Sequence, residues 1–204
     1  MGTIPRSRFT DYMVRENSLD RRGFKAWVFV PAMLFGAEAK WWGDRGKRTS
    51  PHEGLDCCLF SDPWGNLLRL KEGTRIPAMY AGTVVAIIDD FLGKSIVLEH
   101  RLPNNHGPFL TIYGHTVVKD TLHVGSTVNE AEIVGTLAGT SKSPVHVHPH
   151  LHVSLAQPSD RASYENLTWR HLSDPELFTM TDPLSVIGGP YRLIERVEEI
   201  PEPT

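Results

Sequence analysis

The sequence predicts an all-β fold, mainly an antiparallel sheet or a flattened barrel, with short helices and with extensions at both ends. Short β-branched or aromatic runs recur between residues 54 and 156, and turn formers such as FLGK and LPNNHGP separate them. The 204 residues show no repeat of solenoid length. We therefore expect one domain at residues 41–190, between an N-terminal arm at 1–40 and a charged, Pro-rich tail at 191–204.

The individual elements follow in chain order. The polar N-terminal arm has room for a short helix, and FKAWVFV at 24–30 predicts a strand that Pro31 ends. A loop of glycine, basic residues and turn formers follows at 41–51. Further strands are predicted at 54–60, 83–89, 95–100, 109–115, 131–139 and 150–156. After residue 160, LTWRHLSDPELF is expected to form a helix or irregular turns.

Composition excludes several classes of protein. The net charge is −3 and no basic run stands out, so nothing favours a nucleic-acid partner. No apolar stretch approaches the roughly 20 residues of a membrane span, and the N-terminus lacks the apolar core of a signal peptide. Cys57 and Cys58 are neighbours and cannot form a disulfide framework, so we expect two buried strand residues rather than a pair of metal ligands.

The segment HLHVS at 150–154 carries the first candidate site. On a strand, alternate residues share a face, so His150, His152 and Ser154 would point one way while Leu151 and Val153 enter a core. Two imidazoles about 7 Å apart on one face can meet around one small centre. One can then bind an ion while the other serves the reacting group. Two half-exposed strand histidines are the alternative.

A second candidate joins His52 to Asp56 across three residues that include Gly54. The run CCLF that follows would be buried, and a carboxylate entering a buried strand needs a compensating charge or hydrogen bonds. A metal ion supplies that charge, and Gly54 allows the backbone to turn between the two side chains. A turn with an incidental salt bridge is the alternative.

A third candidate is Tyr-Gly-His at 113–115, the end of the predicted strand FLTIYGH. Strand alternation puts Phe109, Thr111, Tyr113 and His115 on one face. His115 stands at the strand end, where functional residues are often found. A surface histidine is the alternative.

Together, His-x-x-x-Asp, Tyr-Gly-His and His-Leu-His occur in this order in the lysostaphin-type zinc metallopeptidases, and the chain resembles that family from about residue 46 to 187. The resemblance implies a duplicated, hybrid-like β fold. Supporting segments resemble the family's Gly-x-Arg stretch, its glycine turns and strands, and its closing Asp-Pro-Leu, at 46–48, 81–85, 95–100, 124–128, 133–135 and 182–184.

The resemblance also implies the chemistry. Zn²⁺ would be held by His52, Asp56 and His152, leaving a fourth tetrahedral position for water. His115 and His150 would assist catalysis, one as general base and the other as hydrogen-bond donor to the oxyanion, in either order. The implied activity is a zinc metalloendopeptidase that cleaves peptides of bacterial cell-wall peptidoglycan. The implied location is the cell envelope, the periplasm or outside the cell, although no signal peptide is visible.

The last motif departs from the family, because SKSPVHVHP replaces a glycine-rich stretch before it. His146 and His148 continue the spacing of two, so another register is possible. We prefer His150 and His152 because an apolar alternating strand follows them directly. Pro149 also disfavours a central strand through His148.

Two other functions fit parts of the pattern. A non-catalytic member of the same fold would bind peptidoglycan or regulate a protein partner, although all five expected positions are filled. A metal-binding or carrier protein would use the histidine cluster at 146–152, and its metal binding would survive loss of Asp56. Trp41 and Trp42 have no counterpart in the resemblance, and we expect them in the core or on the wall of a groove.

Overall fold

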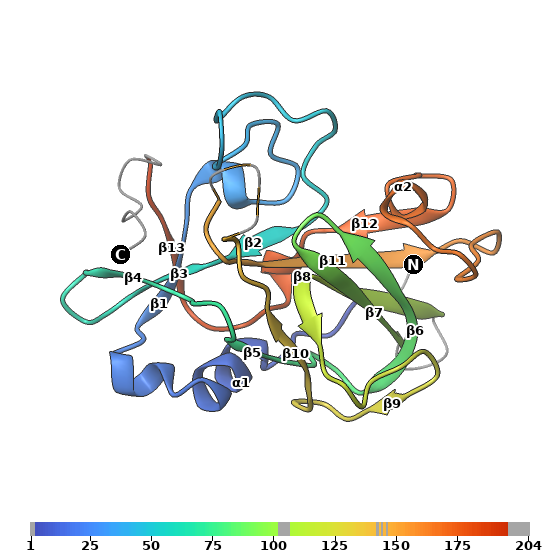
Figure 1. Cartoon of the computed structure of the whole chain (residues 1–204), viewed down its shortest axis with the longest axis horizontal. Helices are drawn as coiled ribbons and strands as arrows, with labels where there is room; N and C mark the ends of the chain where they lie inside the picture. Colours follow the sequence, from blue (N-terminus) through green and yellow to red (C-terminus); the bar gives the residue numbers. More distant parts are fainter. Residues whose placement is uncertain (1–2, 102–106, 142, 144, 146, 196–204) are drawn as a thin grey trace.

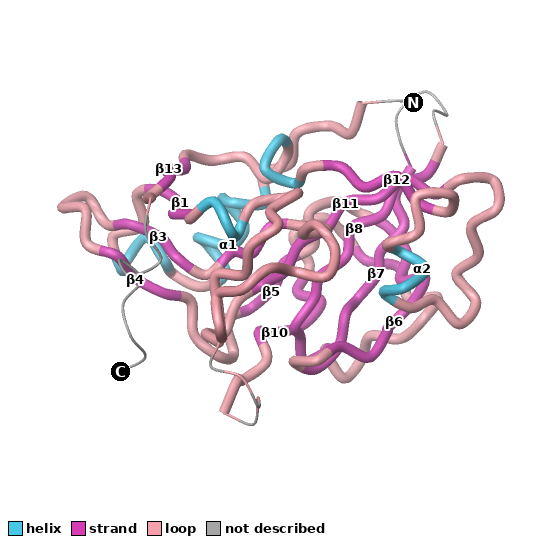
Figure 2. Tube along the Cα trace, turned by 90° about the horizontal axis from the view of Figure 1, so that it is seen from above, coloured by secondary structure: helices cyan, strands magenta, loops and turns pink. Residues whose placement is uncertain are grey.

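The computed structural model describes residues 3–101, 107–141, 143, 145 and 147–195, and over these residues the fold is mainly antiparallel β (Figure 1). This confirms the predicted class. The strands form two sheets that stay open, so of the two forms expected, the antiparallel sheet is found and a closed barrel is not. Seen from above, the smaller sheet lies at one end of the molecule and the larger sheet at the other (Figure 2).

The smaller sheet has the strand order β13-β1-β3-β4. Its strands are β1 (Ala26–Phe29), β3 (Leu59–Ser61), β4 (Leu67–Arg69) and β13 (Tyr191–Leu193). β13 runs parallel to β1, and the other pairs are antiparallel. The predicted strand at 24–30 is confirmed as β1, and the first three residues of the expected tail form β13.

The larger sheet has the strand order β12-β11-β8-β7-β6-β9, with β2 paired to β11 and with β10 paired to both β5 and β8. The strands are β2 (Leu55–Cys57), β5 (Arg75–Pro77), β6 (Gly82–Asp90), β7 (Gly93–Arg101), β8 (Pro108–Val118), β9 (Thr127–Val128), β10 (Ile133–Leu137), β11 (Leu151–Pro158) and β12 (Phe178–Thr181). They confirm the predicted strands at 83–89, 95–100, 109–115, 131–139 and 150–156.

The strand predicted at 54–60 is in fact two strands in different sheets. β2 pairs with β11 of the larger sheet, whereas β3 pairs with β1 of the smaller one. Cys58 stands between them, and both it and Cys57 are buried free thiols, as expected of small strand residues. This short segment therefore links the two sheets and brings Asp56 alongside β11.

The helices are α1 (Phe9–Glu16) and α2 (Trp169–Leu172), with 3₁₀ turns at Leu19–Arg22 (η1), Pro31–Met33 (η2) and Pro183–Ser185 (η4). α1 buries Phe9 and Met13 in the main core, where the ring centroid of Phe9 lies 6.4 Å from that of Tyr113. The helix α1 thus packs against the core of the domain. No helix of the described part of the chain has the length and apolar character to cross a membrane.

β11 separates the core from the site. Leu151, Val153 and Leu155 enter the main core, as the alternation predicts. The opposite face of β11 carries His152 and Ser154. Farther along this face, the segment around α2 covers the strands and forms a second hydrophobic cluster with them, which includes Leu172 and Phe178. The central strand thus presents a polar patch at one end of its outer face.

Candidate functional site

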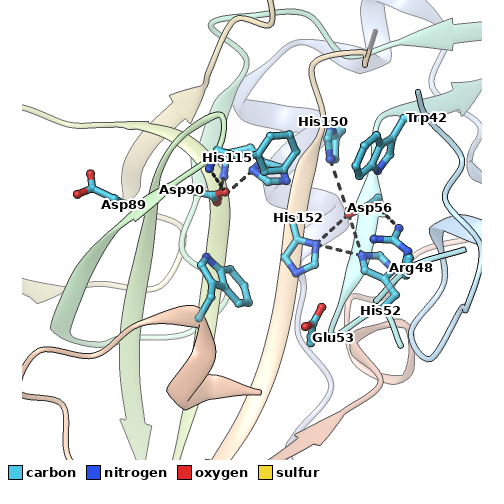
Figure 3. A pocket seen from close by; sticks show the side chains of 12 residues that line it. Trp42, Arg48, His52, Glu53, Asp56, Asp89, Asp90, His115, His150 and His152 are labelled. Atoms are coloured by element: carbon cyan, nitrogen blue, oxygen red, sulfur yellow. Dashed lines mark hydrogen bonds and ion pairs between the residues drawn. The ribbon is translucent and has the colours of Figure 1, made fainter. Parts of the chain in front are cut away.

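Three side chains that are distant in the sequence meet on the outer face of β11. β2 runs antiparallel to β11 in a register that sets Asp56 directly opposite His152. Oδ1 of Asp56 lies 2.9 Å from Nδ1 of His152 and 3.1 Å from Nε2 of His52, and the two nitrogens are 3.1 Å apart (Figure 3). All three residues are buried. The structure thus brings together the three residues expected as metal ligands.

Gly54 lets His52 and Asp56 reach this point. A Cβ atom on Gly54 would lie 2.3 Å from the carbonyl oxygen of Val153 and 2.7 Å from Nε2 of His152. The segment therefore lies almost backbone to backbone against β11, a close approach that only glycine allows. The sequence predicted only that Gly54 allows a turn. The structure shows a second role, because a residue without a side chain at this position leaves room for the neighbouring strand.

Hydrogen bonds on the outer sides of the two imidazoles leave their inner nitrogens facing Asp56. Nδ1 of His52 lies 2.9 Å from the carbonyl oxygen of Leu34. A carbonyl only accepts, so Nδ1 carries the proton and Nε2 faces Asp56 as a lone pair. Oγ of Ser154 lies 2.9 Å from Nε2 of His152, which leaves Nδ1 facing the same carboxylate. Two imidazole nitrogens and a carboxylate oxygen this close together form a donor set that fits zinc.

The other oxygen of Asp56 is held from behind. Nε1 of Trp41 donates to Oδ2 at 2.7 Å, and Nη2 of Arg48 lies 3.5 Å from it. Oδ1 is therefore the atom left for the site. Burial raises the pKa of Asp56, but the electrostatic effect of the adjacent His52 and His150 and the hydrogen bonds with His152 and His52 outweigh it and hold the pKa well below its usual range. Asp56 is thus a carboxylate at neutral pH.

His150 approaches the same centre from the residue just before β11. Its Nδ1 lies 2.8 Å from the carbonyl oxygen of His148, so Nδ1 carries the proton and Nε2 is a lone pair. This Nε2 lies 3.9 Å from Oδ1 of Asp56. Burial, followed by the nearby His115, lowers the pKa of His150 to about 3, so the ring is neutral at physiological pH.

His115 also reaches the centre, but the prediction of the face on which its side chain lies is wrong. Strand alternation put it on the face of Tyr113, yet Tyr113 is buried in the main core while His115 lines the cavity, 4.5 Å from His150 between ring centroids. The pairing of β8 with β7 shifts register between Lys94 and Ile96, and His115 has a φ of 63°. This β-bulge turns the side chain out of the alternation and toward the site.

The structure shows where the histidines of both possible registers of the last motif lie. His150 and His152 face the common centre, whereas His148 contacts Arg69, whose Nη1 lies 2.7 Å from its Nδ1. β11 begins at Leu151, so no strand runs through His148. His146, the remaining member of the alternative register, lies outside the described residues.

A cavity of about 440 Å³ opens over the centre. Three aromatic side chains form its walls. The ring centroids of Trp42 and Phe91 lie 5.9 Å apart, and Trp169 meets His152 edge to face at 5.3 Å. Arg48 and Glu53 add charged groups to the lining. The centre is therefore reached from a cleft large enough for a segment of peptide.

Sequence reasoning missed the contacts of two residues. Trp41 was expected in the core or on a groove wall, and it is buried, but its N–H also holds Asp56. A buried indole needs a hydrogen-bond acceptor, which is the signal that could have pointed to a carboxylate partner. Asp90 contacts His115. Nothing in IIDDFLGK distinguishes it from an ordinary turn former. Trp42 does stand on the cavity wall, as expected.

Comparison with protein families gives one match. Residues 63–163 match the model described as peptidase family M23. This range contains His115, His150 and His152, while His52 and Asp56 lie upstream of it. Among curated proteins, no sequence matches the chain.

Several solved structures of peptidases are similar in fold. The catalytic domain of the antimicrobial peptidase lysostaphin from Staphylococcus simulans is 20% identical, over 81% of this chain and 88% of that one, with a TM-score of 0.43. A solution structure of lysostaphin is 21% identical, over 66% and 42% of the two chains, with a TM-score of 0.42. A zinc-containing peptidase from Vibrio cholerae is 19% identical, over 66% and 36%, with a TM-score of 0.41. The match spans less than half of the last two chains, and similarity at this level carries no information about substrate.

Proposed function

The chain belongs to peptidase family M23, and from this premise we propose that it is a zinc metalloendopeptidase that cleaves peptide bonds of bacterial cell-wall peptidoglycan. In this proposal His52, Asp56 and His152 are the zinc ligands. His115 and His150 are the catalytic histidines. The observation that carries the proposal is the meeting of two imidazole nitrogens and one carboxylate oxygen within 3.1 Å of one another.

The shape of the site favours a catalytic centre over a structural one. A structural zinc is enclosed by four protein ligands, whereas catalytic sites have three and keep one position for water or substrate. Here the group that can hold an ion consists of His52, Asp56 and His152, and the cavity opens directly onto it. The domain that carries this activity would span residues 41–190.

The remaining chemistry is supplied by the chain's own imidazoles. Zinc, when bound, would lower the pKa of a water molecule and polarise the carbonyl of the scissile bond. Either His115 or His150 then accepts a proton from the attacking water. The other would donate a hydrogen bond from a ring N–H to the developing oxyanion. The accepted proton finally passes to the leaving amine.

The nature of the substrate rests on the family and on the cleft. A peptide chain lying in the cleft would contact the aromatic side chains that line it, Trp42, Phe91 and Trp169. The peptidoglycan substrate follows from the resemblance to lysostaphin-type enzymes.

The direct test is digestion of purified peptidoglycan, with mass analysis of the released peptides. The proposal predicts that the zinc-loaded protein releases peptides, and that a chelator or His152→Ala abolishes release. His123→Ala, which removes an exposed histidine from a turn, is the matched control and should behave as the wild type. Products that persist unchanged in the chelator would contradict zinc-dependent cleavage.

The same experiment addresses the alternatives. A non-catalytic member of the fold would bind zinc and peptidoglycan without releasing peptides. A metal carrier that uses the cluster at 146–152 would retain its metal in Asp56→Ala. The position of Asp56 between both histidines favours the peptidase over the carrier.

A further inference from the structure

We infer that Asp90 is a positioning residue for His115: its carboxylate sets the orientation and tautomer of the ring, so that Nε2 faces the zinc site as the proton acceptor. This inference rests on the proposed function, and it assigns the two catalytic histidines different roles. It is carried by the contacts of Asp90, a residue that belongs to none of the three expected motifs.

Asp90 ends β6, and its carboxylate is 5% exposed. Both of its oxygens are engaged. Oδ1 accepts a hydrogen bond from the backbone N–H of Phe91 at 2.6 Å. Oδ2 accepts one from Oγ of Ser95 at 2.6 Å and one from the backbone N–H of His115 at 3.1 Å. Behind them, Nε1 of Trp169 donates to Oγ of Ser95 at 3.2 Å. The carboxylate is thus fixed from several sides.

The ring of His115 lies against this fixed carboxylate. Its Nδ1 is 3.0 Å from Oδ2 of Asp90, at the distance of an ion pair but off the line of a hydrogen bond. Among the described residues, no other group hydrogen-bonds this buried nitrogen. A buried N–H without an acceptor is costly, so a small rotation of the ring toward Asp90 is favourable. Nδ1 then carries the proton.

The opposite side of the ring faces the site. Figure 3 shows His115 between Asp90 and the pair His150 and His152. With Nδ1 on the Asp90 side, Nε2 is directed toward these two histidines as a lone pair. The bulge in β8 makes this possible, because the same Asp90 oxygen that meets the ring also binds the N–H of the bulged residue.

The two catalytic histidines differ in the group behind them. Nδ1 of His150 has a neutral backbone carbonyl, whereas Nδ1 of His115 has a carboxylate. A buried carboxylate at Nδ1 holds the imidazole in the required tautomer and stabilises the imidazolium that forms on proton transfer. Burial raises the pKa of Asp90, but the adjacent His115 ring and the hydrogen bonds from Ser95 and from the backbone N–H of His115 outweigh it and lower the pKa below its usual range, so the carboxylate stays charged. His115 is therefore the better proton acceptor.

The first test is the tautomer, which needs no turnover. Long-range ¹H–¹⁵N correlation spectra of the zinc-loaded protein at neutral pH, assigned with His115→Gln, should show His115 protonated at Nδ1. In Asp90→Asn the ring should shift toward the Nε2-protonated form. The wild-type spectrum decides even if the variant fails to fold, because a ring protonated at Nε2 in the wild type would overturn the inference.

The second test is activity on purified peptidoglycan. Asp90→Asn keeps an oxygen that can accept the backbone N–H groups, and it should retain one equivalent of zinc while releasing peptides about 100-fold more slowly or worse. Asp160→Asn is the matched control, since this exposed carboxylate lies in a turn outside the lining of the cavity.

The combinations of results separate the possibilities. A slow Asp90→Asn variant with an unchanged tautomer would mean a purely structural role and would overturn the inference. So would a changed tautomer with activity within threefold of the wild type. A wild-type protein that releases no peptides would contradict the proposed function instead, and the spectra would still decide whether Asp90 sets the tautomer.

Discussion

Nε1 of Trp41 donates a hydrogen bond of 2.7 Å to Oδ2 of Asp56, and both side chains are 2% exposed. The two residues lie fifteen positions apart, on either side of the loop that carries Arg48. The bond fixes which carboxylate oxygen turns toward His52 and His152. Trp41 also meets His150 edge to face, with ring centroids 5.0 Å apart, so one indole orients both a proposed ligand and a proposed catalytic ring.

Trp41→Phe should weaken zinc binding. The substitution keeps an aromatic ring in the core but removes the N–H, so Asp56 is free to rotate, and loss of such an outer partner typically costs about 10- to 100-fold in metal affinity. Competition with a chelator dye measures the change. Trp42→Phe is the control, because this ring packs against Phe91 and should leave the affinity unchanged. Equal affinities for Trp41→Phe and the wild type would remove the indole from the metal site.

Gly54→Ala should damage the site through sterics. The added methyl group would lie 2.3 Å from the carbonyl oxygen of Val153, so β2 must move away from β11. We expect a loss of about 1–3 kcal/mol in the free energy of unfolding, together with weaker zinc binding. Urea denaturation with and without zinc measures both. Gly46→Ala is the control, since its Cβ would meet only the side chain of Asp44. A fully stable, zinc-binding Gly54→Ala would refute the close packing.

His100 should make stability depend on pH. Burial lowers the pKa of His100 to about 4, and Nδ1 and Nε2 contact the carbonyl oxygen of Ala81 and Oγ1 of Thr111. Because the folded pKa lies below the ordinary 6.5, the unfolded chain binds more protons between these values. The contribution of neutral His100 to the free energy of unfolding is therefore fully present above pH 6.5. It is lost as the pH falls toward 4, and the loss is on the order of 3 kcal/mol.

The measurement is the difference in unfolding free energy between wild type and His100→Gln, without metal, from pH 4 to 8. Taking the difference cancels the contributions that the other titrating groups make to both proteins. The wild type should lose more stability than the variant on acidification. Parallel curves would show that His100 does not contribute.

The parts of the site that follow from local pattern could be predicted from the sequence. Alternation of apolar and polar residues from His150 into β11 indicated the shared face of His150 and His152, because an apolar residue follows each of them. The spacing of His52 and Asp56 with a glycine between them indicated convergence. The order of strands along the chain was also predictable, since turn formers separate them.

The parts that depend on pairing between distant strands could not be predicted. The bulge that redirects His115 arises from the register of β8 against β7, and no residue in FLTIYGH signals it. The break at Cys58 reflects pairing with two different sheets. The contact of Asp90 with His115 could not be predicted either, because Asp90 meets His115 only once the bulge has formed.

The central claim is that His52, Asp56 and His152 share one zinc ion, while His115 and His150 stand beside it. Zinc titration of the metal-free protein, read by isothermal calorimetry, tests this most directly. One equivalent should bind to the wild type and to His115→Ala and His150→Ala, and affinity should collapse in His52→Ala, Asp56→Ala and His152→Ala. Wild-type zinc affinity in Asp56→Ala would contradict the account.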